Sequence, residues 1–228
     1  MKPCASSVRS GDCAVTGTVI ILNGTSSAGK TTLARTLQEA LAEPYLYLGI
    51  DTFIMMVPER YYSDEPTSDP TITTCVVDTD SAGPCVELKV GSVDSRVFRA
   101  MYSAVAALAN RGNNVIFDDV MTEPGCLEEA VIALHRLRVL FVGVRCPLAV
   151  LEQRERERGD RLVGMARGLF DRVHTHGLYD LEVDTAQQSV EQCVESVLQA
   201  LATAGQPSAL QRLFTGLAAA GNIDPAST

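Results

Sequence analysis

Short apolar runs alternate with longer amphipathic stretches along most of the chain. Runs rich in Val, Ile, Leu and Phe predict five strands, over residues 19–23, 46–50, 114–118, 139–144 and 181–183. The run over 139–144 is almost wholly apolar, which is typical of a strand that is buried on both faces of a parallel sheet.

Between these runs, apolar residues recur every three or four positions, as they do on one face of a helix. The pattern predicts a short helix within 53–57, ended by Pro58, and longer helices over residues 30–42, 94–111, 124–136, 147–158 and 190–201. Strands that alternate with helices indicate an α/β fold built on a doubly wound parallel sheet.

These elements make up one domain, over residues 18–204. Residues 1–17 are polar and mixed, and we expect them to be disordered. Residues 63–91 are rich in Ser, Thr, Asp, Pro and Gly and are too long for a simple connection, so they are either functional or form a small hairpin. The C-terminal extension, 205–228, predicts one small amphipathic helix.

Composition and charge narrow the range of partners. With 19 basic and 28 acidic side chains the net charge is −9, which argues against a nucleic-acid binder that needs a broad cationic face. No stretch approaches the roughly 20 apolar residues of a membrane span, so we expect no membrane partner. The seven cysteines include no Cys-x-x-Cys, so we expect free thiols and a cytoplasmic protein. No third ligand joins His174 and His176, so we expect no zinc site there.

The loop after the first predicted strand carries the clearest chemical signal. Residues 24–31 fit G-x-x-x-x-G-K-S/T, the phosphate-binding loop between a strand and a helix. Backbone N–H groups of such a loop hold the nucleotide phosphates, the lysine bridges the β- and γ-phosphates, and the hydroxyl after it binds Mg²⁺. We expect nucleotide contacts from Gly24, Thr25, Ser26, Ser27, Ala28, Gly29, Lys30, Thr31 and Thr32.

Carboxylates follow two of the other predicted strands. Asp118 and Asp119 end the third strand, where one of them would hold Mg²⁺ beside the phosphates; the position favours Asp118, and the alternative role is a cap on the next helix. Asp51 follows the second strand in the same way. It is a candidate general base near the γ-phosphate, with a helix N-cap as its alternative role.

Four arginines cluster around Gly159. Guanidinium groups bind phosphate oxygens, and such a cluster beside a glycine is typical of a lid, here over residues 154–166, that closes over ATP. The alternative is a solvated helix face in which interleaved glutamates pair with the arginines. We assign that alternative to Arg156, expect nucleotide contact from Arg154, and expect catalytic roles for Arg158 and Arg161.

An apolar stretch after Asp51 is a candidate wall for the acceptor site. Ordinary core packing is an equal alternative for each of its members. The candidates are Phe53, Ile54, Met55, Met56, Val57 and Tyr61.

Seven segments, between residues 18 and 204, give the chain a resemblance to a known family. They are 20–31 (IILNGTSSAGKT), 48–52 (LGIDT), 115–120 (VIFDDV), 142–146 (VGVRC), 158–161 (RGDR), 163–166 (VGMA) and 179–185 (YDLEVDT). Together they resemble the chloramphenicol phosphotransferases, P-loop kinases related to the shikimate and adenylate kinases. The segment 63–91 looks longer than in this family, and the tail 205–228 is additional.

The resemblance implies a sheet of five parallel strands and transfer of the γ-phosphate of ATP to a primary hydroxyl of chloramphenicol. Asp51 matches the proposed base of the family, Lys30 and Thr31 its loop lysine and metal ligand, and Arg158 and Arg161 its lid arginines. The adenine is expected near Asp184 and Thr185.

We therefore expect an ATP- and Mg²⁺-dependent O-phosphotransferase that phosphorylates a small hydroxylated antibiotic and confers resistance. One alternative is the same chemistry on a nucleoside antibiotic, and GTP is an alternative to ATP. Others are a nucleotide switch or hydrolytic motor, a non-catalytic nucleotide-binding protein, and a nucleotidyl transferase. The sequence is compatible with a homo-oligomer.

Overall fold

The computed structural model describes residues 16–81, 83–123, 125–159, 162–203, 205 and 207–224. The segment 1–17, predicted to be disordered, lies almost wholly outside the described residues, and so does Arg161 of the predicted lid. Five parallel strands form the main sheet in the order β2-β6-β1-β7-β8, which confirms the predicted five-stranded parallel sheet. They are β1 (Thr18–Asn23), β2 (Tyr45–Gly49), β6 (Asn114–Asp119), β7 (Arg138–Arg145) and β8 (Leu181–Asp184).

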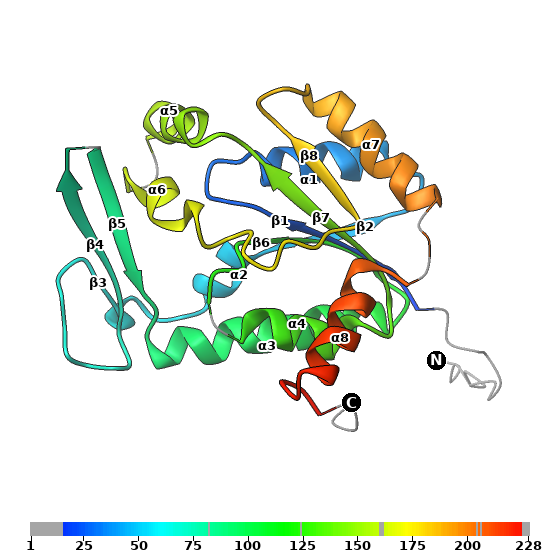
Figure 1. Ribbon diagram of the computed structural model, residues 1–228, viewed down its shortest axis with the longest axis horizontal. Helices are drawn as coiled ribbons and strands as arrows, with labels where there is room; N and C mark the ends of the chain where they lie inside the picture. The colour runs from blue at the N-terminus through cyan, green and yellow to red at the C-terminus, as the bar shows by residue number, and fades with distance from the viewer. Residues whose placement is uncertain are drawn as a thin grey trace, which may run out of the picture.

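Helices cover both faces of this sheet (Figure 1). In β1, Val19 and Ile21 point into one core while Ile20 and Leu22 point into the other, and all four side chains are fully buried. Two covered faces are what a parallel sheet requires. Within the described part of the chain, no helix is long and apolar enough to cross a bilayer. One face carries α1 (Lys30–Ala40), α5 (Leu148–Arg158) and α7 (Val190–Thr203), and the other carries α3 (Ser92–Ala109), α4 (Cys126–Leu134) and α8 (Ala209–Ala219).

The segment after β2 contributes a short helix and a second, smaller sheet (Figure 1). The helix α2 (Ile50–Ile54) begins earlier than the predicted 53–57, and a 3-10 turn, η1 (Glu59–Tyr61), follows it. In the small sheet β3 (Tyr62–Ser63) pairs with β4 (Thr73–Asp80), and β4 forms an antiparallel hairpin with β5 (Gly83–Lys89). Cys75 pairs with Leu88 in this ladder and Cys85 with Asp78, and both cysteines are free thiols.

The hairpin packs on α6 (Met165–Phe170), a helix that the sequence pattern does not predict. Val86 N donates a hydrogen bond to Gly164 O at 3.0 Å. A β-carbon on Gly168 would lie 2.0 Å from the Val86 carbonyl oxygen, so this close approach of two backbones requires glycine. The position of α6 thus depends on a partner that is distant in the sequence.

A buried carboxylate joins α6 to α5. Glu155 is fully buried and accepts hydrogen bonds from Gly164 N at 2.7 Å and from Ala166 N at 2.8 Å. It therefore satisfies N–H groups at the start of α6, where a negative charge is also favoured by the helix dipole. The solvated helix face considered for the glutamates of this helix therefore does not apply to Glu155. Hairpin, α6 and α5 form one packed unit.

The C-terminal extension completes the core under the sheet. Ser208 caps α8 with a reciprocal pair of hydrogen bonds to Gln211, a capping box. Leu210 of α8 is fully buried, and Phe214 stacks on His135, the C-cap residue of α4, with ring centroids 3.8 Å apart. The predicted small helix of this segment is therefore present and covers apolar side chains of the main domain.

A polar cluster fixes the end of β1, directly before the phosphate loop. Asn23 Nδ2 donates to Tyr179 OH at 2.8 Å and lies 3.3 Å from His176 Nε2. His174 Nδ1 lies 2.6 Å from the same tyrosine hydroxyl. Phe141 stacks on His176, with ring centroids 5.2 Å apart. His174 Nδ1 and His176 Nε2 thus each lie beside a polar side-chain group of this cluster.

The two histidines of this cluster should make the protein less stable as the pH falls. Burial, and to a smaller extent Arg145, lowers the pKa of both His174 and His176 to about 4 from an ordinary value of 6.5. As the pH falls below 6.5, these histidines take up protons in the unfolded chain but stay neutral in the folded protein. The stabilisation that is complete above pH 6.5 is therefore lost as the pH falls toward about 4. We expect a lower urea midpoint at about pH 5 than at about pH 7.5. This difference should shrink in His176→Gln, and an equal difference in variant and wild type would contradict the assignment.

Candidate active site

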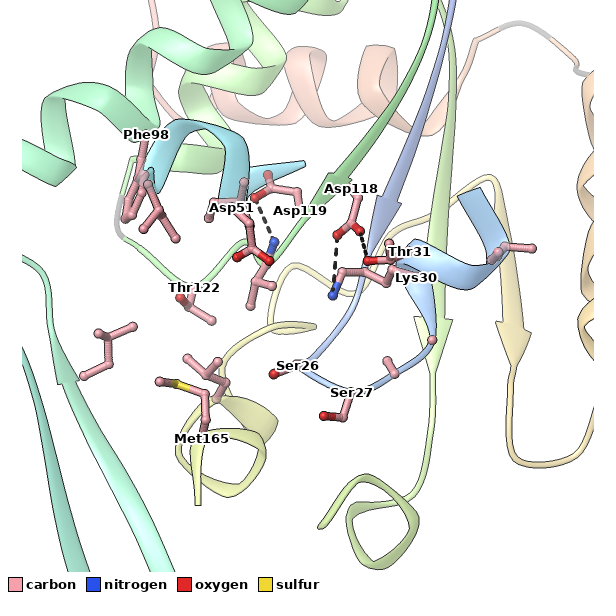
Figure 2. A pocket seen from close by; sticks show the side chains of 18 of the residues that line it. Ser26, Ser27, Lys30, Thr31, Asp51, Phe98, Asp118, Asp119, Thr122 and Met165 are labelled. Carbon is pink, nitrogen blue, oxygen red and sulfur yellow. Dashed lines mark hydrogen bonds and ion pairs between the residues drawn. The ribbon is translucent and has the colours of Figure 1, made fainter. Parts of the chain in front are cut away.

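A cavity of about 760 Å³ opens at the carboxyl edge of the main sheet. Its walls come from the loop after β1, from α2, from the end of β6, and from the hairpin, α3 and α6. Parallel strands bring their carboxyl ends to one edge, which is why residues far apart in the sequence meet here. Figure 2 shows Asp51 between the group of Lys30, Thr31 and Asp118 on one side and Phe98 on the other.

The phosphate loop forms one end of this cavity, which residues 26–32 line. Gly29 has φ 86°, the left-handed region that glycine adopts without strain, and leads directly into α1. Ser27 adopts φ 64°, which is rare for a residue other than glycine and is typical of strained functional loops. Its buried Oγ has no hydrogen-bond partner among the described residues. Together with the N-terminus of α1, these groups form a cradle that suits an anion.

Two side chains at the start of α1 meet the carboxylate at the end of β6. Thr31 Oγ1 donates to Asp118 Oδ2 at 2.9 Å, and Lys30 Nζ lies 3.7 Å from Asp118 Oδ1. Lys30 also donates to the carbonyl oxygens of Gly24 and Thr25, at 2.9 and 3.1 Å. The predicted lysine, hydroxyl and carboxylate are thus in contact with one another.

Oxygen donors of this kind fit Mg²⁺. Within the described residues, no cluster of three or more His, Cys, Asp or Glu side chains could hold a metal by itself. Mg²⁺ is usually bound by one or two protein oxygens together with substrate phosphates and water, so the hydroxyl of Thr31 and the carboxylate of Asp118 match its needs. Tyr47 OH donates to Asp118 Oδ2 at 3.0 Å and orients this carboxylate. Arg35 lies over the Tyr47 ring, 4.3 Å from its centroid.

Asp119 is held separately from Asp118. Its carboxylate is fully buried and accepts from Tyr102 OH and from Val120 N, each at 2.7 Å. Burial raises the pKa of Asp119 to about 6. Successive side chains of a strand point to opposite faces, which explains why the two neighbours differ. Neither caps the following helix, because the residue before α4 is Gly125.

Asp51 lies in the first turn of α2 and lines the cavity. The N-cap residue of this helix is Gly49, so the alternative role of Asp51 as a cap is not observed. The side chain is exposed and points into the cavity beside the loop (Figure 2).

The arginines of α5 differ in their surroundings. Arg154 donates from Nη1 to Thr185 Oγ1 at 2.9 Å and from Nη2 to Thr185 O at 2.7 Å, and this hydroxyl in turn donates to Ala28 O at 2.9 Å. Arg154 is therefore tied to the phosphate loop. Arg158 lines the same cavity. Arg156 is exposed, in agreement with its predicted place on the solvated face of the helix.

Of the two residues expected near the adenine, Thr185 and Asp184, the cavity is lined by one. Thr185 lines the cavity. Asp184 instead accepts from Ala186 N at 2.9 Å and from Gln187 Nε2 at 2.8 Å, and so stabilises the turn after β8.

The predicted acceptor wall is only partly brought to the cavity. Among its described members Ile54 lines the cavity, whereas Phe53 packs edge-on against Phe117 in the core and Val57 is buried. The side chains of Met55 and Met56 are 86% and 66% exposed. Arg60 lies over the ring of Tyr61, which is not among the lining residues. The short helix turns most of this apolar stretch away from the cavity.

The hairpin, α3 and α6 supply the apolar wall instead. The sequence pattern predicts the helix over 94–111 that carries Phe98 and Met101, but contains no signal for Tyr47, Tyr62 or Thr73. The segment that forms the small sheet brings Tyr62 and Thr73 to the cavity, whereas Tyr47 lies on β2 outside the lining and contacts Asp118. The apolar lining residues are Ile54, Leu88, Val90, Phe98, Met101, Met165 and Leu169.

The fold matches those of known kinases. The structure of the Mycobacterium tuberculosis APS kinase CysC in complex with AMPPNP and APS aligns with a TM-score of 0.57 at 14% identity, covering 82% of this chain and 98% of that one. Shikimate kinase from Acinetobacter baumannii aligns with a TM-score of 0.51 at 16% identity, covering 85% and 97%. At these identities the likeness shows the fold, which is that of P-loop kinases.

Sequence relatives are closer. Two Mycobacterium tuberculosis proteins, from strains CDC 1551 and H37Rv, are named as O-phosphotransferases, and each is 33% identical over 205 residues, 86% of this chain and 88% of theirs. The model of the family described as "Chloramphenicol phosphotransferase-like protein" matches residues 17–202. With this match across the sheet, the phosphate loop and the cavity, the chain belongs to the chloramphenicol phosphotransferase-like family of phosphotransferases.

Proposed function

We propose that this protein transfers the γ-phosphate of ATP to a hydroxyl group of a small antibiotic of the chloramphenicol type, and thereby confers resistance. The observation that carries the proposal is that four features line one cavity: the phosphate loop, the oxygen ligands of Thr31 and Asp118 that suit Mg²⁺, the exposed Asp51, and an apolar wall. Membership of the family supports the acceptor class. The five described cysteines are free thiols, which supports work in the reducing cytoplasm.

The phosphate loop provides the binding energy for the nucleotide. Backbone N–H groups of residues 26–31 and the N-terminus of α1 would hold the β-phosphate, and Lys30 would exchange its carbonyl contacts for the β- and γ-phosphate oxygens. Thr31 and Asp118 would hold Mg²⁺. The ion would neutralise charge on the phosphates when bound.

Asp51 acts as the general base. The oxygen of the acceptor hydroxyl forms a bond to the γ-phosphorus as the bond to the β,γ-bridging oxygen breaks, ADP leaves, and the hydroxyl proton passes to the Asp51 carboxylate. An exposed carboxylate beside the loop suits this role because it is accessible to the acceptor.

Arginines of α5 stabilise the transferring group. Arg154 is already fixed at the loop through Thr185, and Arg158 lines the cavity beside it. Together with Arg161, Arg158 would close over the phosphates and exclude water, a competing acceptor. Ile54, Phe98 and Met165 would enclose the apolar part of the antibiotic.

A panel assay tests the reaction. We expect Mg²⁺, ATP and the purified protein to add one phosphoryl group to one member of a panel of hydroxylated antibiotics that includes chloramphenicol and nucleoside antibiotics, as read by mass spectrometry. Lys30→Ala should lower this rate at least about a hundredfold, because the charge that binds the transferred phosphoryl group is removed. ATP hydrolysis that is independent of every panel compound would favour a switch or motor, and addition of a nucleotidyl group would favour a nucleotidyl transferase.

Metal binding tests the role of Asp118. Asp118→Asn should weaken the binding of Mn²⁺, as a spectroscopic substitute for Mg²⁺, to the protein–ADP complex by about tenfold or more. Electron paramagnetic resonance of free Mn²⁺ measures this. Asp78→Asn, which removes an exposed carboxylate from the hairpin, is the control and should bind Mn²⁺ as the wild type does. Equal Mn²⁺ affinity in Asp118→Asn and wild type would exclude Asp118 as a ligand of the metal.

A further inference from the structure

A second polar group lies in the cavity, on the side of the hairpin. Its members come from three elements: Tyr62 from β3, Thr73 from β4, and Asp94 from the first turn of α3. All three line the same cavity as the phosphate loop and Asp51. We call them the hairpin cluster. The reaction proposed above assigns no role to it.

The carboxylate at the centre of this cluster is buried and rigidly held. Asp94 is 1% exposed; Tyr62 OH donates to its Oδ1 at 2.9 Å, and Thr73 Oγ1 donates to its Oδ2. Gly91 N in turn donates to Thr73 Oγ1 at 2.9 Å, which fixes the direction of that hydroxyl. A carboxylate offers about four acceptor positions, so two neutral hydroxyl donors leave acceptor capacity unused.

Charge around the cluster is unbalanced. None of the ion pairs between described residues involves Asp94. Glu123, another of the five described carboxylates of the lining, is paired with Arg172 at 3.2 Å. The described cations of the lining, Lys30, Arg154 and Arg158, belong to the phosphate loop and to α5. The hairpin side of the cavity therefore favours a hydrogen-bond donor or a positive charge and opposes an anion.

We propose that Asp94 is the specificity-determining residue of the acceptor site, which binds a hydrogen-bond-donating group of the acceptor and prefers a protonated amine. The inference rests on the proposed function and narrows its substrate class. The acceptor is a neutral or cationic molecule with an apolar middle, a hydroxyl for phosphorylation near Asp51, and a donor group beyond it. Acceptors that carry a carboxylate at that end are rejected, because two negative charges would meet on the hairpin side of the cavity.

Binding measurements on matched compounds test this assignment. The probes are the free amine obtained by deacylating chloramphenicol, its neutral N-acetyl derivative, and shikimate as an anionic alcohol, each titrated calorimetrically into the protein loaded with Mg²⁺ and a non-hydrolysable ATP analogue. We expect the wild type to bind the amine at least about tenfold more tightly than the N-acetyl derivative, and shikimate most weakly. Asp94→Asn should abolish the preference for the amine and change the affinity for the N-acetyl derivative less than about threefold.

Glu87→Gln is the matched control. It removes one carboxylate from the exposed face of the same hairpin and should leave the preference for the amine unchanged. A preference that survives in Asp94→Asn, or that is lost equally in Glu87→Gln, would overturn the proposal. The comparison of the three probes on the wild type needs no variant, and it overturns the proposal if the amine does not bind or binds no better than the neutral compound.

Phosphorylation of the same probes separates the two proposals. If the amine preference and its loss in Asp94→Asn are observed while no panel compound is phosphorylated, the role of Asp94 stands and the proposed reaction fails. If a panel compound is phosphorylated while the amine is not preferred, the reaction stands and the role of Asp94 fails.

Discussion

The parallel pairing of β1 with β6 is the constraint on which the site depends. Its register sets Leu22 opposite Asp118 and Asn23 opposite Asp119, so the phosphate loop leaves β1 beside the carboxylates that end β6. Gly24 N donates to Asp119 O at 3.3 Å and continues that pairing into the loop. The contact between Thr31 and Asp118 follows from this register. If the register shifted by one residue, Asp119 would take the place of Asp118 beside Thr31. The carboxylate of Asp118 would then point to the opposite face of the sheet.

The opposite wall of the cavity depends on a different set of contacts, made by the hairpin. Val86 pairs with Gly164, Gly168 allows the two backbones to touch, and Glu155 ties the start of α6 to α5. The apolar wall of the cavity on the hairpin side and the helix that carries Arg154 and Arg158 are therefore parts of one unit. Movement of either part requires the other to move or these buried hydrogen bonds to break, which links the position of the hairpin to that of the α5 arginines.

Sequence reasoning succeeded where the chemistry is local. The phosphate loop is one contiguous segment, and the position of Asp51 and Asp118 at strand ends follows from the apolar runs before them. Asp118 and Asp119 differ in their surroundings because of strand alternation and because Tyr102 of α3 donates to Asp119, a contact for which the sequence contains no signal. Glu155 reads as one of several charges on a helix face, yet it is buried because α6 packs over it.

The acceptor wall was the least predictable part for a related reason. Apolar character near Asp51 suggested a lining, but α2 begins at Ile50 and turns Met55 outward, while Phe53 joins the core against Phe117. The groups that replace them, such as Phe98 and Asp94, reach the cavity only because the hairpin folds back on α3 and α6. Contacts between segments that are distant in the sequence leave no periodic signal in either of them.

Phosphoryl transfer in Asp51→Asn, measured beside ATP affinity on the same sample, tests the central claim most directly. With the acceptor that the panel identifies, the account predicts that kcat falls by about a hundredfold or more while the affinity for Mg²⁺·ATP changes less than about threefold, because the base is lost and the phosphate loop is intact. Asp64→Asn, at an exposed acid near the hairpin, should retain wild-type kcat. Near-normal turnover in Asp51→Asn, or loss of ATP binding together with turnover, would contradict the account.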